Sequence, residues 1–128
     1  MVKFVLLLVN GDIKDIEIQL KSKDKEKPLN KILNDKRIGL KDKFLQQFEN
    51  VGKGKLLELY IYSKLDNNYN LHVYGFEKGT QENNHELPQI SDGKKIFGDI
   101  LISKLDKNNN YMDINSNFYE NIYNKLFY

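Results

Sequence analysis

The sequence predicts a single α+β domain over residues 1–128: a mostly antiparallel sheet of about six strands, with two short middle helices and a C-terminal helix covering one face. Paired runs of β-branched and aromatic residues are separated by Asn, Asp and Gly, which is typical of hairpins. Other stretches carry apolar residues at helical spacing. A chain of 128 residues is long enough to bury one core without disulfides.

The central hairpin, residues 55–79, is the element around which we expect the others to be arranged. Leu57, Leu59 and Ile61 alternate with polar or aromatic residues, and apolar residues return after the turn-forming run 66–70. An isolated hairpin is marginal in water, so the rest of the chain must supply more strands and a cover.

An N-terminal hairpin precedes it. Residues 2–9 are nearly all apolar, which predicts a strand in the middle of the sheet. Residues 10–12, Asn-Gly-Asp, predict a tight primed turn. Ile16, Ile18 and Leu20 alternate with polar residues, so the second strand is expected to be half buried.

Two middle helices are expected after a charged connector, residues 21–27. The first begins at Pro28 and has apolar residues at helical spacing, namely Leu29, Ile32 and Leu33. The second runs from about Leu40 to Asn50 and has a longer apolar stripe, formed by Leu40, Phe44, Leu45, Phe48 and Val51.

The C-terminal part predicts a third hairpin and a helix. Residues 97–105 form one strand and residues 111–114 a short returning strand. Asn115 or Ser116 can then cap the last helix. One side of that helix is expected to carry Phe118, Ile122, Lys125 and Leu126.

Composition excludes several classes of function. Twenty basic and eighteen acidic residues give a net charge of only +2, and Arg37 is the sole arginine, which disfavours a dedicated nucleic-acid reader. Without cysteine, disulfides and thiolate metal sites are excluded, and a reducing compartment is expected. Residues 5–9 are too few to span a membrane, so no membrane association is expected. No cofactor is expected, because the Gly-Lys-Gly-Lys run at 52–55 lacks the signature and topology of a phosphate loop.

The polar loop 77–93 is the longest stretch without an apolar period, and such loops are often functional or mobile. His85 lies in it beside Glu82, Asn83 and Glu86, where imidazole and carboxylates can share a metal or a proton. A solvated loop histidine is the competing interpretation, since no nucleophile or third ligand accompanies it. An enzyme centred on His85 is therefore the weaker alternative, and no catalytic residue is assigned.

Two further patterns have competing interpretations. Tyr60, Tyr62, Tyr74 and Phe76, with nearby lysines, could offer stacking platforms to a single-stranded nucleic acid, but cross-strand packing beneath a helix explains them as well. His72 is expected to face solvent or a neighbouring strand.

Several motifs resemble a small family of uncharacterised proteins encoded by nucleocytoplasmic large DNA viruses of protists. The motifs are Tyr74-Gly75-Phe76, Gly79, Glu82-Asn83-Asn84-His85-Glu86-Leu87-Pro88, Phe97-Gly98-Asp99-Ile100 and Phe118-Tyr119. The likeness covers mainly residues 56–128 and carries no enzymatic activity with it. It implies a viral protein in the host cytoplasm or the virion that binds a viral or host protein. The interaction is then expected through the 77–93 loop, at Gly79, Glu82, Asn83, His85 and Glu86.

Overall fold

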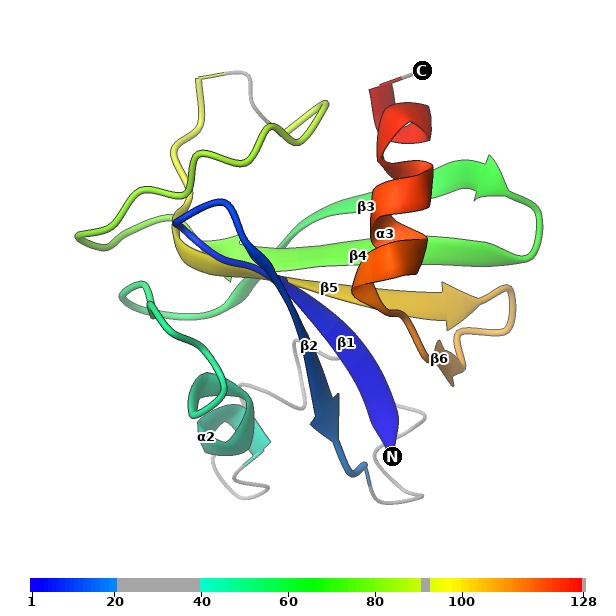
Figure 1. Cartoon of the computed structure of the whole chain (residues 1–128), viewed down its shortest axis with the longest axis horizontal. Helices are drawn as coiled ribbons and strands as arrows, with labels where there is room; N and C mark the ends of the chain where they lie inside the picture. The colour runs from blue at the N-terminus through cyan, green and yellow to red at the C-terminus, as the bar shows by residue number, and fades with distance from the viewer. Residues whose placement is uncertain (21–39, 91–92, 128) are drawn as a thin grey trace.

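The computed structural model describes residues 1–20, 40–90 and 93–127. Its six strands are all paired antiparallel in one sheet, in the order β2-β1-β5-β4-β3 with β6 also on β5. The strands are β1 (Val2–Leu7), β2 (Ile13–Ile18), β3 (Leu57–Asp66), β4 (Tyr69–Phe76), β5 (Phe97–Asp106) and β6 (Tyr111–Met112). The α+β class, the antiparallel sheet and the three hairpins are confirmed, and β5 joins the first two hairpins by pairing with both β1 and β4 (Figure 1).

The first hairpin has the predicted strands but a different turn. The β1 strand lies between β2 and β5, as its continuous apolar run predicts. The backbone N–H of Leu8 donates to the carbonyl of Asp12 at 2.9 Å, and Gly11 has a φ of +99°. Asn10 keeps an ordinary φ because its side chain accepts a hydrogen bond from the Asp12 N–H, forming an Asx turn. The tight primed turn predicted at residues 10–12 is therefore wrong.

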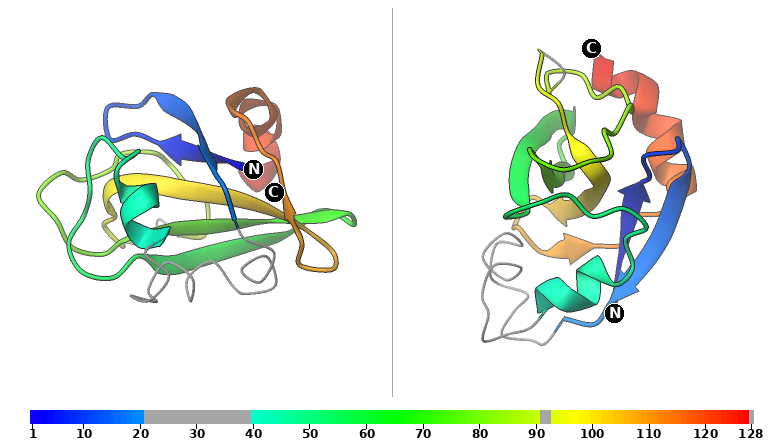
Figure 2. Two further views of the ribbon diagram at one scale, coloured as in Figure 1. Left: turned by 90° about the horizontal axis from the view of Figure 1, so that it is seen from below. Right: turned by 90° about the vertical axis from the view of Figure 1, so that its left-hand side faces the viewer.

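The sheet is buried on both faces, so the prediction that one face carries all the helices is wrong. On one side, which we call the α2-side core, Phe4, Leu6 and Leu101 pack with Phe44 and other buried residues. On the other, the α3-side core, apolar residues of β1, β4 and β5 pack with the C-terminal helix and with Leu87, Ile90 and Ile96. Figures 1 and 2 show α2 (Leu40–Leu45) and α3 (Ser116–Ile122) on opposite sides of the twisted sheet. Because β1, β4 and β5 are apolar on both faces, each face needs a cover.

The α2 helix ends five residues earlier than predicted. Phe44 and Phe48 are buried as expected, but Val51 is exposed and does not belong to the stripe. The backbone N–H groups of Glu49 and Asn50 donate to the Asp99 carboxylate, at 2.7 and 3.1 Å, instead of continuing the helix. The connector 21–27 and the helix predicted from Pro28 lie outside the described residues.

The C-terminal helix begins where one of the two candidate caps predicts. The Asn115 side chain accepts a hydrogen bond from the Phe118 N–H at 2.8 Å, and α3 continues as a 3₁₀ helix, η2 (Tyr123–Phe127). Its buried side differs from the prediction and consists of Tyr119, Ile122 and Leu126. Phe118 lies half buried beside this side, where its ring contacts Tyr69.

The central hairpin is confirmed, but the faces of β3 are not those predicted. Leu57 and Ile61 are 36% and 37% exposed, whereas Tyr62 is buried in the α3-side core. A register shift between Glu58 and Tyr60 reverses the alternation within the strand. In the described part of the chain β3 has β4 on one side and no strand on the other, so it is an edge strand.

Among the described residues, no helix combines the length and apolar character needed to cross a membrane.

Candidate functional site

The first half of the 77–93 loop is held on the sheet by Asn83. Its buried side chain donates hydrogen bonds from Nδ2 to the carbonyls of Leu7, at 2.9 Å, and Gly98, at 3.0 Å. The Asn83 N–H donates to the Ile96 carbonyl at 2.7 Å, and Gly98 donates to the Gln81 carbonyl at the same distance. Asn83 is therefore an anchor inside the molecule, and its side chain is not presented to a partner.

Gly79 has a packing role as well. A Cβ built there lies 2.7 Å from the Cβ of Phe97 and 3.3 Å from the Cα of Gly52. A side chain at position 79 would thus push apart two segments that touch at this point. Gly79 and Asn83 therefore have structural roles that set the path of the loop. Of the predicted interaction residues, Glu82, His85 and Glu86 remain accessible at the surface.

His85 is half buried next to the β1–β2 turn. Its Nδ1 lies 2.9 Å from the Asn83 side-chain oxygen, which can only accept, so Nδ1 carries the proton. Burial lowers the pKa of the imidazole, while a hydrogen bond to the backbone of Gly11 and the charge of Asp99 act in the opposite direction. Glu86 lies with it in a shallow, open depression that is also lined by Asn10. Glu82 and Glu86, the two carboxylates near His85 in the sequence, do not form a metal site with it. The described residues contain no group of three His, Cys, Asp or Glu side chains that could hold a metal ion.

Asp99 and Gly98 form a junction that the sequence did not single out as structural. The fully buried Asp99 carboxylate accepts from the N–H groups of Val9, Glu49 and Asn50. Gly98 has a φ of +73°, and a Cβ built there lies 2.6 Å from the Gly52 nitrogen and 2.7 Å from the Asn50 carbonyl. Only glycine fits both the conformation and the close approach. The Phe-Gly-Asp motif is therefore explained by folding.

The four aromatic residues considered as a nucleic-acid platform do not share a face. Tyr74 and Phe76 are 1% exposed in the α2-side core, whereas Tyr62 belongs to the α3-side core. The Tyr62 hydroxyl donates to the Pro88 carbonyl at 2.7 Å, and burial raises its pKa. Of the four, only Tyr60 is half buried. Stacking of successive bases needs exposed rings side by side, so this arrangement does not provide it.

A concavity with apolar walls lies beside the edge strand β3, on its α3-side face. Leu59, Ile90 and Ile96 form apolar walls of a pocket of about 420 Å³. Its polar lining consists of Glu77, Gln89, Lys94 and Lys95. The lysines are exposed, and Lys94 makes a long ion pair of 4.0 Å with Glu77. An apolar floor with a charged rim fits an apolar side chain that is followed or preceded by a charged group.

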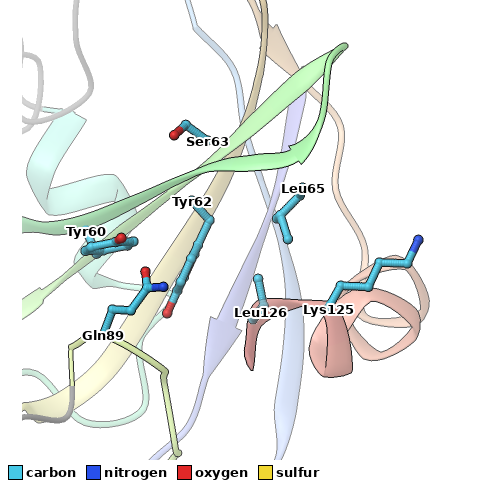
Figure 3. A pocket seen from close by; sticks show the side chains of 7 residues that line it. All are labelled: Tyr60, Tyr62, Ser63, Leu65, Gln89, Lys125 and Leu126. Atoms are coloured by element: carbon cyan, nitrogen blue, oxygen red, sulfur yellow. The ribbon is translucent and has the colours of Figure 1, made fainter. Parts of the chain in front are cut away.

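A second, smaller pocket of about 170 Å³ adjoins it along β3. Figure 3 shows Tyr60 and Tyr62 projecting from β3, with the Gln89 side chain pointing toward their rings. Leu126 and Lys125 of η2 form the opposite wall. The rings of Tyr60 and Tyr62 are 4.8 Å apart between centroids.

Gln89 lines both pockets and has an uncommon backbone conformation. Its φ is +68°, which a residue with a side chain adopts rarely and at an energetic cost. We call the two pockets, joined at Gln89 and lying along β3, the β3 groove. Gln89 and Ile90, rather than the residues around His85, thus form the part of the 77–93 loop that lines the groove. The signal that could have indicated it is the pair of apolar residues, Leu87 and Ile90, inside an otherwise polar loop.

A polar cluster on the opposite, α2-side face also escaped the sequence interpretation. His72 Nδ1 lies 3.3 Å from the Glu58 carboxylate across β3 and β4, which agrees with the expectation that His72 faces solvent or a strand neighbour. Ser103 lies opposite His72 on β5. Within the described part of the chain, His72 Nε2 and Ser103 Oγ are buried and have no hydrogen-bond partner. Ser103 is fully buried, so a substrate has no access to its hydroxyl.

No protein-family model, curated protein or solved structure matches the chain.

Proposed function

We propose that this chain is a protein-interaction module that receives an extended segment of a partner along β3. The observation that carries the proposal is the free edge of β3, a strand of ten residues with β4 as its single neighbour in the described part of the chain. An edge strand presents unpaired N–H and C=O groups, which a partner strand can pair with.

The surroundings of β3 support this use of the edge. Ile61, paired with His72, is exposed on the α2-side face, and the β3 groove adjoins the same strand on the α3-side face. A strand added to β3 places alternate side chains on the two faces, so one set can enter the groove and the other can cover Ile61. Register shifts on either side leave Tyr60–Tyr62 as the regular part of β3, and we expect main-chain pairing to centre there.

The viral origin, the virion or host-cytoplasm location and the viral or host identity of the partner remain predictions. They come from the resemblance described above. The earlier prediction that Glu82, His85 and Glu86 make the contact also remains open, and the experiment below separates it from the β3 proposal.

The test is selection of binding peptides from a displayed random library, followed by amide hydrogen exchange of the protein with and without each selected peptide. We expect protection of amides in Leu57–Asp66 and loss of binding in the Ile61→Lys variant, because a charge on the edge opposes strand addition. Lys107→Glu, on the distant β5–β6 turn, is the matched surface control.

Protection confined to residues 82–86 would instead support the loop contact and overturn the β3 proposal. Sedimentation equilibrium tests whether the β3 edge pairs with a second copy of the chain. A dimer that the Ile61→Lys variant dissociates would show such self-association and overturn the proposed partner.

A further inference from the structure

The end of the sheet at which β3 begins is basic. There β3 starts with Leu57 paired to Gly75, and β4 ends where Phe76 pairs with Phe97 at the start of β5. The segments at this end, 51–56, 77–82 and 93–96, carry five exposed lysines and two exposed glutamates. These residues are Lys53, Lys55, Lys78, Lys94, Lys95, Glu77 and Glu82.

The opposite end has a smaller excess of positive charge, although the exposed Lys125 lies beside the smaller pocket there. The turns 63–70 and 104–110 contain Asp66 and Asp106 among three lysines. One of these, Lys104, lies over the rings of Phe118, at 3.9 Å, and Tyr69, at 4.8 Å. Burial lowers its pKa, and its ammonium group is engaged inside the molecule. The charge along β3 is therefore asymmetric.

The larger pocket of the β3 groove lies at the basic end. It combines the apolar walls of Leu59, Ile90 and Ile96 with the ammonium groups of Lys94 and Lys95. In an extended segment, residues i and i+2 lie on the same face, about 7 Å apart. One side chain can thus fill the apolar pocket while the second-next residue on that face reaches the lysines.

From this asymmetry we infer that the partner is an acidic extended peptide with a direction: an apolar residue enters the pocket, and a carboxylate two residues further toward its C-terminus meets Lys94 and Lys95. The direction follows from antiparallel addition, the more favourable pairing, which sets the C-terminal end of the peptide beside the first residues of β3. Complementary charge then fixes register and orientation. This inference rests on the proposed function of β3.

The test compares two fluorescein-labelled peptides of identical composition by fluorescence anisotropy. The forward peptide is fluorescein-Thr-Val-Thr-Val-Thr-Leu-Thr-Asp-Asp-amide, labelled at its N-terminal amine, and the control has the reverse order of residues with the same label and amide. We expect the forward peptide to bind about tenfold more tightly, with a difference that shrinks as salt is raised.

The double variant Lys94→Glu, Lys95→Glu should remove the preference, and Lys107→Glu should keep it. Both variants change exposed residues, and circular dichroism checks that each remains folded.

Three outcomes overturn the inference. If both peptides bind equally and Ile61→Lys abolishes both, β3 is a binding edge without the proposed direction, and the proposed function stands. If the reversed peptide binds more tightly, the direction is wrong. If neither peptide binds the unmodified protein, the inferred ligand class is wrong, and the library selection then decides independently whether β3 binds any peptide.

Discussion

Asn83 and Asp99 are buried where β1 ends and β5 begins, whereas Ser103 and the Nε2 atom of His72 are buried on the α2-side face of β4 and β5. At the first place both side chains are hydrogen-bonded to the backbone: Asp99 accepts from three N–H groups, and Asn83 donates to two carbonyls. At the second, His72 Nε2 and Ser103 Oγ have no partner within the described part of the chain.

The difference reflects what each region must hold together. Asp99 and Asn83 bind segments far apart in the sequence, whose backbone groups have left the sheet ladder and need other partners. His72 and Ser103 stand on paired strands, whose backbone groups are satisfied by the ladder itself. Polar side chains are thus required at the junction and dispensable in the middle of the strands.

Asp99→Ala should produce the largest effect. It leaves the N–H groups of Val9, Glu49 and Asn50 without their acceptor, and we expect a loss of about 3–5 kcal/mol in the free energy of unfolding. Urea denaturation followed by circular dichroism measures it. A loss below about 1 kcal/mol would mean that water replaces the carboxylate at this junction.

Asn83→Ala should have the second largest effect, a loss of about 2–3 kcal/mol, since two buried carbonyls lose their donor. Asn84→Ala is the matched control: the same residue type, next in the chain and exposed, with an expected change within about 0.5 kcal/mol. Equal losses in the two variants would contradict the anchoring role of Asn83.

Ser103→Ala should change the free energy of unfolding by no more than about 0.5 kcal/mol, and it sharpens the contrast with Asn83. The substitution removes a buried hydroxyl that lacks a well-formed hydrogen bond within the described residues. Its interaction with the Tyr74 hydroxyl, which acts to lower the pKa of Tyr74, is at most a weak hydrogen bond. Parallel urea curves of the two variants provide the comparison. A loss as large as that of Asn83→Ala would show that the hydroxyl is used.

His85 should contribute the smallest effect, visible as a pH dependence. Burial lowers its pKa in the folded state, so below about pH 6.5 the unfolded chain binds the proton first. Stability should therefore fall as the pH falls through this window, and the His85→Asn variant should lose less between pH 7.5 and 5.5. Thermal unfolding at both pH values gives the two slopes. Identical slopes would mean that the imidazole titrates equally in both states.

The candidate site was predictable only in part. The 77–93 loop was selected as an interaction surface because it is polar and long, and Gln89 and Ile90 of that loop do line the β3 groove. The residues named within it were chosen for their chemistry, and Asn83 is instead an internal anchor. A polar side chain in a loop has the same sequence signal whether it faces solvent or bonds to backbone groups that fold against it.

The sequence by itself determined the local features: the three hairpins, the central position of β1 and a helix cap at Asn115 or Ser116. Each depends on a period of two or on turn and cap chemistry within a few residues. The tertiary structure alone decided the order of the strands, the opposite placement of α2 and α3, the early end of α2 and the groove beside β3. These depend on contacts such as Asp99 with Glu49 and Asn83 with Leu7, which join residues 50 and 76 positions apart. No local pattern records such contacts, because they exist only once the chain is folded.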